Sequence, residues 1–282
     1  MFTDKRLAFI GTGVMAEAMI RGLVSRQLVP PDQIIGANVL PDRNEYIQAQ
    51  YGIHTTADNR EAVKNADLVI LCVKPQALSK VMHGLYRAVE HHALVLSIVA
   101  GAPIAAIVHE LAHTAVARAM PNTPAQIGQG ITVWTTTSSV TETQQQQARA
   151  VFGSLGKEIF VEEESYLDMA TALSGTGPAY VFIMMEAMID AGVHMGFSRR
   201  MAQELVFQTL LGSVLYAEQS GKHVAELRNQ VTSPGGTTAE ALYHLEKGGF
   251  RTVISRAIWA AYQRSVTLGK GQNPRLNNPN EP

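Results

Sequence analysis

Residues 7–16 of the chain read Leu7-Ala8-Phe9-Ile10-Gly11-Thr12-Gly13-Val14-Met15-Ala16. An apolar run ends at a glycine-rich turn, and a helical pattern begins directly behind it. This is the context that a dinucleotide-binding G-x-G-x-x-A loop requires, because Gly11 permits the tight turn and Gly13 lets a pyrophosphate approach the backbone. Ala16 lets the helix pack close to the strand. The stretch predicts a nucleotide-binding strand–turn–helix unit.

Short β-like runs and helical stretches continue to alternate down to Glu162, which is typical of a parallel sheet covered on both faces. We therefore expect a doubly wound, Rossmann-type α/β domain. The expected strands are Leu7 to Ile10, Ile34 to Ala37, Leu68 to Val73, Leu94 to Val99, Ala115 to Ala119, Ile131 to Thr135 and Glu158 to Val161. The expected helices are Met15 to Ser25, Arg43 to Gln50, Asn59 to Lys64, Pro75 to Ala88, Ile104 to Leu111 and Glu142 to Ser154.

After the acidic stretch Glu162–Glu164 the β signals stop and a helical pattern with glycine punctuation follows. The chain is thus predicted to divide into a dinucleotide-binding Rossmann domain, residues 1–162, and an all-helical substrate-binding and dimerisation domain, residues 163–282. A helix expected from Pro178 to Met195 has little polar face, so we predict that it also packs across a subunit interface. The Asn- and Pro-rich residues from Gly271 to Pro282 are expected to form a mobile tail.

The composition limits the function classes. With 46% hydrophobic and 17% charged residues and a formal charge of −1 over 282 residues, nothing argues for binding to nucleic acid or to an anionic membrane. We expect neither a signal peptide nor a segment long enough to span a bilayer. A single cysteine, Cys72, excludes an internal disulfide and a zinc cluster of cysteines. These features predict a cytoplasmic protein without a metal site whose partner is a small molecule.

The end of the second expected strand indicates which nicotinamide cofactor is preferred. An acidic residue there pairs with the ribose hydroxyls of NAD, but this chain has Asn38. No strand-end carboxylate repels a 2′-phosphate, and Arg43 is placed to help hold one. We therefore predict NADP in preference to NAD, with NAD still usable. Arg43 is equally compatible with a solvent-facing position in a first helical turn.

Two further loops fall at expected carboxyl ends of strands, where open α/β sheets bind ligands. They are Val73-Lys74-Pro75 and Val99-Ala100-Gly101. Lys74 is open to three interpretations: a phosphate contact, a catalytic amine or a surface charge. Cys72 lies in an apolar strand and is interpreted as a small buried hydrophobe, not as a nucleophile.

A second anion-binding signal lies in the run Ser233-Pro234-Gly235-Gly236-Thr237-Thr238, where a helix is expected to begin. Helix N-termini attract anions, and glycines allow a carboxylate or phosphate to approach the backbone amides. Thr237 and Glu240 have the spacing of a capping box. An ordinary capped turn would have the same sequence pattern, so this stretch alone leaves both interpretations open.

Taken together, the motifs resemble those of pyrroline-5-carboxylate reductases over nearly the whole chain. They are Ile10 to Ala16, Val73-Lys74-Pro75, Met120-Pro121-Asn122-Thr123-Pro124, Ser174-Gly175-Thr176-Gly177-Pro178-Ala179-Tyr180 and Thr232 to Thr238. The last two are much more specific than the nucleotide loop. The chain departs from the family pattern at Thr176, where serine is common, and at Lys222 and Val224, where Glu and Pro are common. Thr176 keeps the hydroxyl, whereas Lys222 and Val224 precede the substrate loop and put substrate affinity in doubt, not the type of reaction.

The resemblance implies NAD(P)H-dependent reduction of L-1-pyrroline-5-carboxylate to L-proline, the last step of proline biosynthesis. It also implies a helical domain that joins subunits into a homodimer or higher oligomer. The implied cofactor residues are Ile10, Gly11, Thr12, Gly13, Val14, Met15, Ala16, Asn38, Asn59, Cys72, Val73, Lys74, Pro75, Val99, Ala100, Gly101, Met120, Pro121, Asn122 and Thr123, the last four near the nicotinamide. The implied substrate residues are Ser233, Gly235, Gly236, Thr237 and Thr238.

In this interpretation the substrate carboxylate is held while hydride reaches the imine carbon, and Thr238 is the catalytic hydroxyl that orients the ring nitrogen. One alternative is a reductase of a related cyclic imino acid. Another is a β-hydroxyacid dehydrogenase, which relies on a lysine in its helical domain. No lysine occurs between Lys157 and Lys222, which argues against it. A binding protein that only senses nucleotide is a third.

Overall fold

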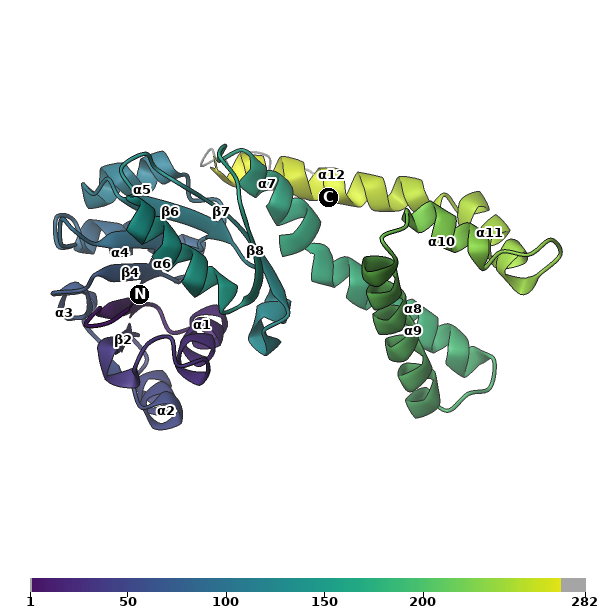
Figure 1. The fold of residues 1–282 in the computed structure, drawn as a ribbon, viewed down its shortest axis with the longest axis horizontal. Coiled ribbons are helices and arrows are strands. Elements are labelled where there is room, and N and C mark those ends of the chain that lie inside the picture. Colours follow the sequence, from purple (N-terminus) through teal and green to yellow (C-terminus); the bar gives the residue numbers. More distant parts are fainter. Residues whose placement is uncertain (1, 270–282) are drawn as a thin grey trace, which may run out of the picture. The chain divides into compact units, whose positions relative to one another are not determined.

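The computed structural model describes residues 2–269 and divides into two compact units (Figure 1). The first unit holds the chain up to Thr176 together with the C-terminal segment from Ala261, and the second runs from Gly177 to Ala260. This division differs from the predicted boundary after residue 162, because the segment between 163 and 176 packs with the Rossmann part. The predicted mobile tail, Gly271 to Pro282, lies outside the described residues.

The first unit is built on one eight-stranded sheet in the order β3-β2-β1-β4-β5-β6-β7-β8. Its strands are β1 Leu7–Ile10, β2 Ile34–Ala37, β3 His54–Thr56, β4 Leu68–Leu71, β5 Leu94–Ser97, β6 Val116–Met120, β7 Gly130–Thr136 and β8 Gly156–Phe160. The pairs from β3 to β6 are all parallel, β7 runs antiparallel to β6, and β8 is parallel to β7. The strand order reverses between β1 and β4, which is where such sheets bind nucleotides.

Helices cover both faces of this sheet, as predicted. They are α1 Val14–Ser25, α2 Pro41–Tyr51, α3 Asn59–Val63, α4 Pro75–Gly84, α5 Ile104–Leu111 and α6 Glu142–Gly153. One core cluster joins Met19 of α1 and Phe152 of α6 to Phe9 of β1, and the other joins Leu78 of α4 and Ile107 of α5. Both clusters consist of buried residues on the two faces of the sheet, so the doubly wound prediction is confirmed.

One strand of this unit was missed, and several element ends differ from the predictions; helix α4, for example, ends at Gly84 and not at Ala88. Strand β3 was not expected, because His54, Thr55 and Thr56 are polar or half-exposed and form a short edge strand without an apolar period. Strands β4 and β5 end two residues earlier than predicted. As a result, Cys72 and Val73, like Ile98 and Val99, lie in the loops beyond the strands.

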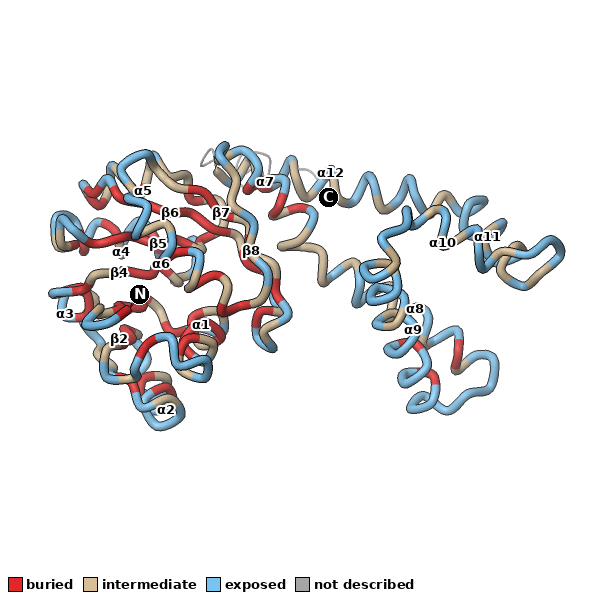
Figure 2. The backbone as a smooth tube through the Cα atoms, viewed as in Figure 1, coloured by how far each residue is buried: buried red, intermediate tan, exposed pale blue. Residues whose placement is uncertain are grey.

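The second unit is helical, as predicted. It holds α8 Gly177–His194, α9 Arg199–Ser220, α10 Val224–Gln230, α11 Thr237–Lys247 and the first half of α12 Phe250–Gly269. Helices α8 and α9 pack closely, and a Cβ added to Gly192 would lie 2.9 Å from the Cβ of Ala202. Within this unit, most residues of α8 to α11 are exposed or only half-buried (Figure 2).

The expectation that no segment is long enough to span a bilayer is wrong as far as helix length is concerned. The short helix α7, Tyr166–Ala170, continues through a π turn, Thr171–Gly175, into α8. The resulting 29-residue helix is, by length and composition alone, long and apolar enough to cross a membrane. The expected helix began only at Pro178, because the Ser-Gly-Thr-Gly-Pro motif was interpreted as a break.

Candidate functional site

The loop after β1 has the backbone that its glycines predict. Gly11 has φ +92°, and a Cβ placed on it would lie 3.0 Å from the carbonyl oxygen of Cys72. The Gly11 amide donates to the carbonyl of Ala37 at 2.9 Å, which fixes the loop across the ends of β1 and β2. An L-residue with a side chain would therefore be strained and crowded here.

The N-terminus of helix α1 has backbone amides that no side chain caps and that can bind an anion. Its N-cap is Gly13, and no side chain caps the first turn. A Cβ added to Gly13 would meet no atom within 4 Å, so a ligand has room to reach the backbone. Val14 is exposed and Met15 half-buried, whereas Ala16 is fully buried against the core. Together with the positive end of the helix dipole, this arrangement fits a pyrophosphate.

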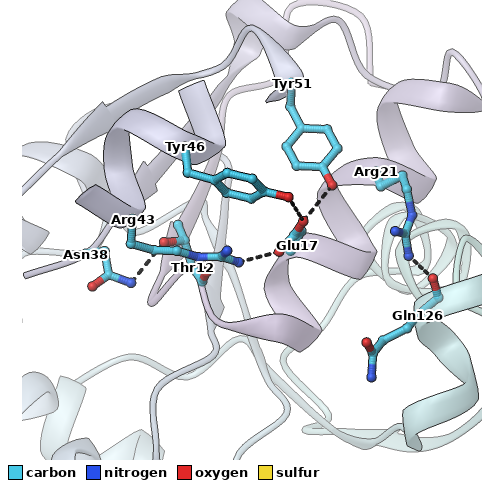
Figure 3. A network of polar contacts seen from close by, with 8 residues as sticks. All are labelled: Thr12, Glu17, Arg21, Asn38, Arg43, Tyr46, Tyr51 and Gln126. Atoms are coloured by element: carbon cyan, nitrogen blue, oxygen red, sulfur yellow. Dashed lines mark hydrogen bonds and ion pairs between the residues drawn. The ribbon is translucent and has the colours of Figure 1, made fainter. Parts of the chain in front are cut away.

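The end of β2 lies against the same loop (Figure 3). Asn38 donates from Nδ2 to the hydroxyl of Thr12 at 2.9 Å, and its own Oδ1 accepts from the amide of Leu40 at 3.1 Å. Arg43 donates from Nε to the carbonyl oxygen of Thr12 at 2.7 Å. Thus Asn38 and Arg43, both predicted to lie near the adenosine ribose, contact one residue of the glycine loop.

The β4 loop also borders the glycine loop. The amide of Cys72 donates to the carbonyl of Ile10 at 2.9 Å, and Val73 is in reach of Gly11. Burial raises the pKa of the Cys72 thiol, which keeps it protonated and supports its interpretation as a small hydrophobe. Lys74 is the exposed N-cap of α4, and Pro75 is the first residue of that helix.

The β5 loop is tied to the end of the chain's last described helix. Val99 is buried, and its amide lies 3.3 Å from the Ser97 hydroxyl that accepts from it. Gly101 has φ +70°, and a Cβ on it would lie 3.1 Å from the Cβ of Leu268. Ala100 is half-buried between them. This loop therefore has little room for larger side chains.

The motif after β6 is joined to a second motif far along the sequence. Asn122 donates from Nδ2 to the carbonyl oxygen of Ser174 at 3.2 Å and accepts at Oδ1 from the amide of Ile131 at 2.9 Å. A Cβ added to Gly175 would lie 2.8 Å from the methyl carbon of Met120. Pro121 is buried and Thr123 exposed. The structure thus brings the π turn to the predicted nicotinamide end of the site.

Asn59 is the remaining predicted cofactor residue. It is the first residue of α3, where Asp58 caps the helix by accepting from the amide of Arg60 at 2.8 Å. Among the residues that the structure describes, no hydrogen bond joins the Asn59 side chain to the glycine loop. Its placement is that of a half-buried residue beyond β3.

The predicted substrate loop precedes α11 in the second unit. Gly235 has φ +68°, and the amide of Gly236 donates to the carbonyl of Ser233 at 3.1 Å. A Cβ on Gly236 would collide with the hydroxyl oxygen of Ser233. The predicted capping box is wrong, because the N-cap is Gly236, one residue before Thr237, and no side chain caps this helix. The first-turn amides, including those of Thr237 and Thr238, start a helix of 11 residues.

Comparisons with known proteins decide the family. Residues 164–268 match the model described as pyrroline-5-carboxylate reductase dimerisation, and residues 6–101 match that of NADP oxidoreductases, coenzyme F420-dependent. The pyrroline-5-carboxylate reductase of Synechocystis sp. is 40% identical over 94% of this chain and 98% of its own length. The chain belongs to the pyrroline-5-carboxylate reductase family.

Solved structures of family members have the same fold. The reductase from Coxiella burnetii superimposes with a TM-score of 0.86 at 36% identity and covers 94% of this chain and 98% of that one. The Plasmodium falciparum pyrroline carboxylate reductase, solved with NADP bound, has a TM-score of 0.86 at 30% identity. The alignment covers 94% of this chain and 98% of the Plasmodium chain. This chain is accordingly an NAD(P)H-dependent reductase, and the dehydrogenase and binding-protein alternatives are wrong.

Sequence reasoning missed two parts of this reductase site. The contact of Ser174 and Gly175 with Asn122 and Met120 was not expected, although both motifs had been singled out. Glu17, which pairs with Arg43, was not singled out at all. These partners are separated by 52 and 26 residues, so no local spacing indicates either contact.

Proposed function

We propose that this chain reduces L-1-pyrroline-5-carboxylate to L-proline, the last step of proline biosynthesis, and that Ser233, Gly235, Gly236, Thr237 and Thr238 bind the substrate. The observation that carries the site assignment is the start of α11, where a glycine N-cap leaves the first-turn amides without a side-chain partner. A small carboxylate is the ligand that such a helix end favours. The substrate has one carboxylate and one ring imine.

The cofactor residues are proposed as predicted, from Ile10 to Ala16, at Asn59 and at the ends of β2, β4, β5 and β6. The open backbone at Gly13 and the uncapped first turn of α1 support a pyrophosphate there. Asn38 and Arg43 support NADPH in preference to NADH. The amide of Asn38 takes the strand-end position where a carboxylate would repel the 2′-phosphate, and the Arg43 guanidinium donates to the same loop residue, Thr12. The dinucleotide supplies the hydride when bound.

Thr238 is proposed as the catalytic residue. Thr238 is the second residue of α11, within its first turn, and is half-buried. Once the carboxylate is bound by the backbone, a hydroxyl in the same first turn donates to the imine nitrogen and polarises the C=N bond. No strong acid is required, because an imine takes a proton from water. Orientation therefore accounts for most of the rate enhancement.

Assembly and location are proposed from the second unit and from the charge. The exposed apolar side chains of α8 and α9 support a homodimer or higher oligomer formed through this unit. We assign the helix from Tyr166 to His194 to subunit packing and not to a membrane. A formal charge of −1 supports a cytoplasmic enzyme that does not bind nucleic acid.

The catalytic assignment is tested by following NADPH oxidation with L-1-pyrroline-5-carboxylate. Thr238→Ala should lower kcat by roughly a hundredfold, as loss of a transition-state hydrogen bond does elsewhere, while NADPH binding persists. Thr238→Ser keeps the hydroxyl and should retain most of the activity. Thr252→Ala, at an exposed position of α12, is the matched control and should behave as the wild type.

The assignment of the substrate is tested with cyclic imino acids of five- and six-membered rings under both cofactors. Efficient turnover of only the six-membered ring would contradict the proposed substrate. Unchanged kcat in Thr238→Ala would contradict the catalytic role and leave the family reaction in place.

A further inference from the structure

Glu17 lies at the centre of a polar network beside the glycine loop (Figure 3). Its Oε2 pairs with Nη2 of Arg43, while its Oε1 accepts from the hydroxyl of Tyr51 at 2.9 Å and from that of Tyr46 at 3.2 Å. Glu17 comes from the first turn of α1, whereas its three partners come from α2. The network therefore connects the helix that follows the glycine loop with the helix that follows β2.

The Glu17 carboxylate is ionised and satisfied in this setting. Burial alone raises its pKa, but hydrogen bonds from Arg43 and Tyr51 outweigh that effect and lower the pKa below its ordinary value. Burial and the bond to Glu17 raise the pKa of Tyr51 to about 12, so the phenol remains a donor. The ion pair is mostly sheltered, with 18% of the Glu17 side chain and 25% of the Arg43 side chain exposed.

Arg43 is held at three points. Its Nε donates to the carbonyl of Thr12, its Nη2 pairs with Glu17, and its guanidinium lies 5.1 Å from the ring centre of Tyr46. A guanidinium has five N–H donors, and these contacts use two of them. Three donors remain on a group that is fixed beside Thr12, to which Asn38 also donates.

We propose that Glu17 is a positioning residue for cofactor choice, which fixes Arg43 so that its remaining donors receive the 2′-phosphate of the adenosine ribose. This inference rests on the proposed NADPH preference and adds the group that enforces it. A free arginine side chain loses rotamer entropy when it is ordered. With Glu17 in place, that loss has already occurred before the nucleotide arrives.

The opposite effect would follow if the carboxylate mainly repelled the phosphate. Two features favour positioning. Glu17 is neutralised by Arg43 and further hydrogen-bonded by two phenols, and its oxygens point at these partners from the α1 side. Removing it would leave the Arg43 guanidinium with two contacts, the Thr12 carbonyl and the Tyr46 ring, and would free the Nη2 end of the group.

The experiment measures nucleotide binding, which does not depend on turnover. Calorimetry with 2′,5′-ADP and with 5′-AMP separates the 2′-phosphate from the rest of the adenosine site. Glu17→Gln should weaken 2′,5′-ADP binding about five- to tenfold and leave 5′-AMP binding unchanged. Tyr51→Phe, which removes one hydrogen bond to Glu17, should produce a smaller change in the same direction. Steady-state kinetics should show a raised KM for NADPH with kcat and the KM for NADH unchanged.

Glu45→Gln is the matched control. Glu45 is an exposed glutamate of α2, the helix that carries Arg43, and the substitution removes one negative charge just as Glu17→Gln does. It should bind both nucleotides as the wild type does. If Glu17→Gln binds 2′,5′-ADP as tightly as the wild type, or more tightly, the positioning role is overturned. If the wild type itself binds both nucleotides equally, the proposed NADPH preference fails and this inference fails with it.

Discussion

The two units of this reductase bury their apolar side chains very differently. In the first unit, two clusters on opposite faces of the sheet are almost fully shielded from solvent. In the second unit, large apolar side chains of α8 and α9 such as Phe182, Ile183, Leu211 and Val214 are exposed. The first unit is therefore a self-contained core, whereas the second requires a further surface to cover it.

The largest effect on stability is expected for a substitution in the buried core of the first unit. Phe152 is fully buried, with its ring centre 5.5 Å from that of Trp134, so Phe152→Ala should lower the free energy of unfolding by about 3–5 kcal/mol. Urea denaturation followed by fluorescence of the buried Trp134 measures this loss. A change under about 1 kcal/mol would mean that the core is loosely packed at this point.

Phe182, which is 60% exposed, provides the matched variant in the second unit. At high dilution, where subunits are separate, Phe182→Ala should have little effect on stability. The loss should increase with protein concentration, because only association buries this ring. Equal losses for both variants at all concentrations would contradict the difference between the units.

An intermediate effect is expected at Asp67, where the first unit holds a sheltered charge. Asp67 accepts from Lys5 Nζ at 2.7 Å and from the amide of Arg6 at 2.9 Å. Although burial raises its pKa, these bonds lower it below the ordinary value of 3.8. The unfolded chain therefore takes up this proton first, and the stabilisation is present above about pH 3.8 and is lost as the pH falls below it.

Asp67→Asn should accordingly cost about 1–3 kcal/mol at neutral pH and weaken the fall in stability below about pH 3.8. Acid titration of unfolding, followed by circular dichroism, measures both effects. Identical acid profiles for variant and wild type would show that other carboxylates dominate.

The smallest effect is expected for a surface ion pair of the second unit. Asp190 and Arg199 lie 2.9 Å apart, but their side chains are 56% and 66% exposed. Asp190→Asn should change the free energy of unfolding by less than about 0.5 kcal/mol. A loss similar to that of Asp67→Asn would mean that this pair is buried in the assembled protein, and the same denaturation experiment detects it.

Whether an element could be predicted from the sequence depended on how clearly its local residue pattern indicates it. Strands β1 and β2 were placed correctly because each is a short apolar run bounded by turn residues. The edge strand β3 was missed because it pairs on one side only and carries no apolar pattern. Likewise, the helix before Pro178 was missed because glycines that usually end a helix are here part of a π turn.

Residues of the site were predictable where local chemistry determines them. Gly11 and Gly13 were identified from their spacing, and the structure gives them the expected backbone and open space. The capping box failed because T-x-x-E spacing does not distinguish an N-cap from the next residue, and Gly236 takes the N-cap position. Glu17 was missed because its partners come together only when α1 packs against α2.

The contacts made by the C-terminal end of α12 have a consequence for folding during translation. Ser265 donates to Asp168 at 2.7 Å, and Leu268 lies against Gly101, so residues near the end of the described chain complete the unit that begins at the N-terminus. Domains of a growing chain fold as they emerge. The sheet of this reductase can form early on the ribosome, but α7 and the β5 loop acquire these contacts only after the whole second unit has been translated.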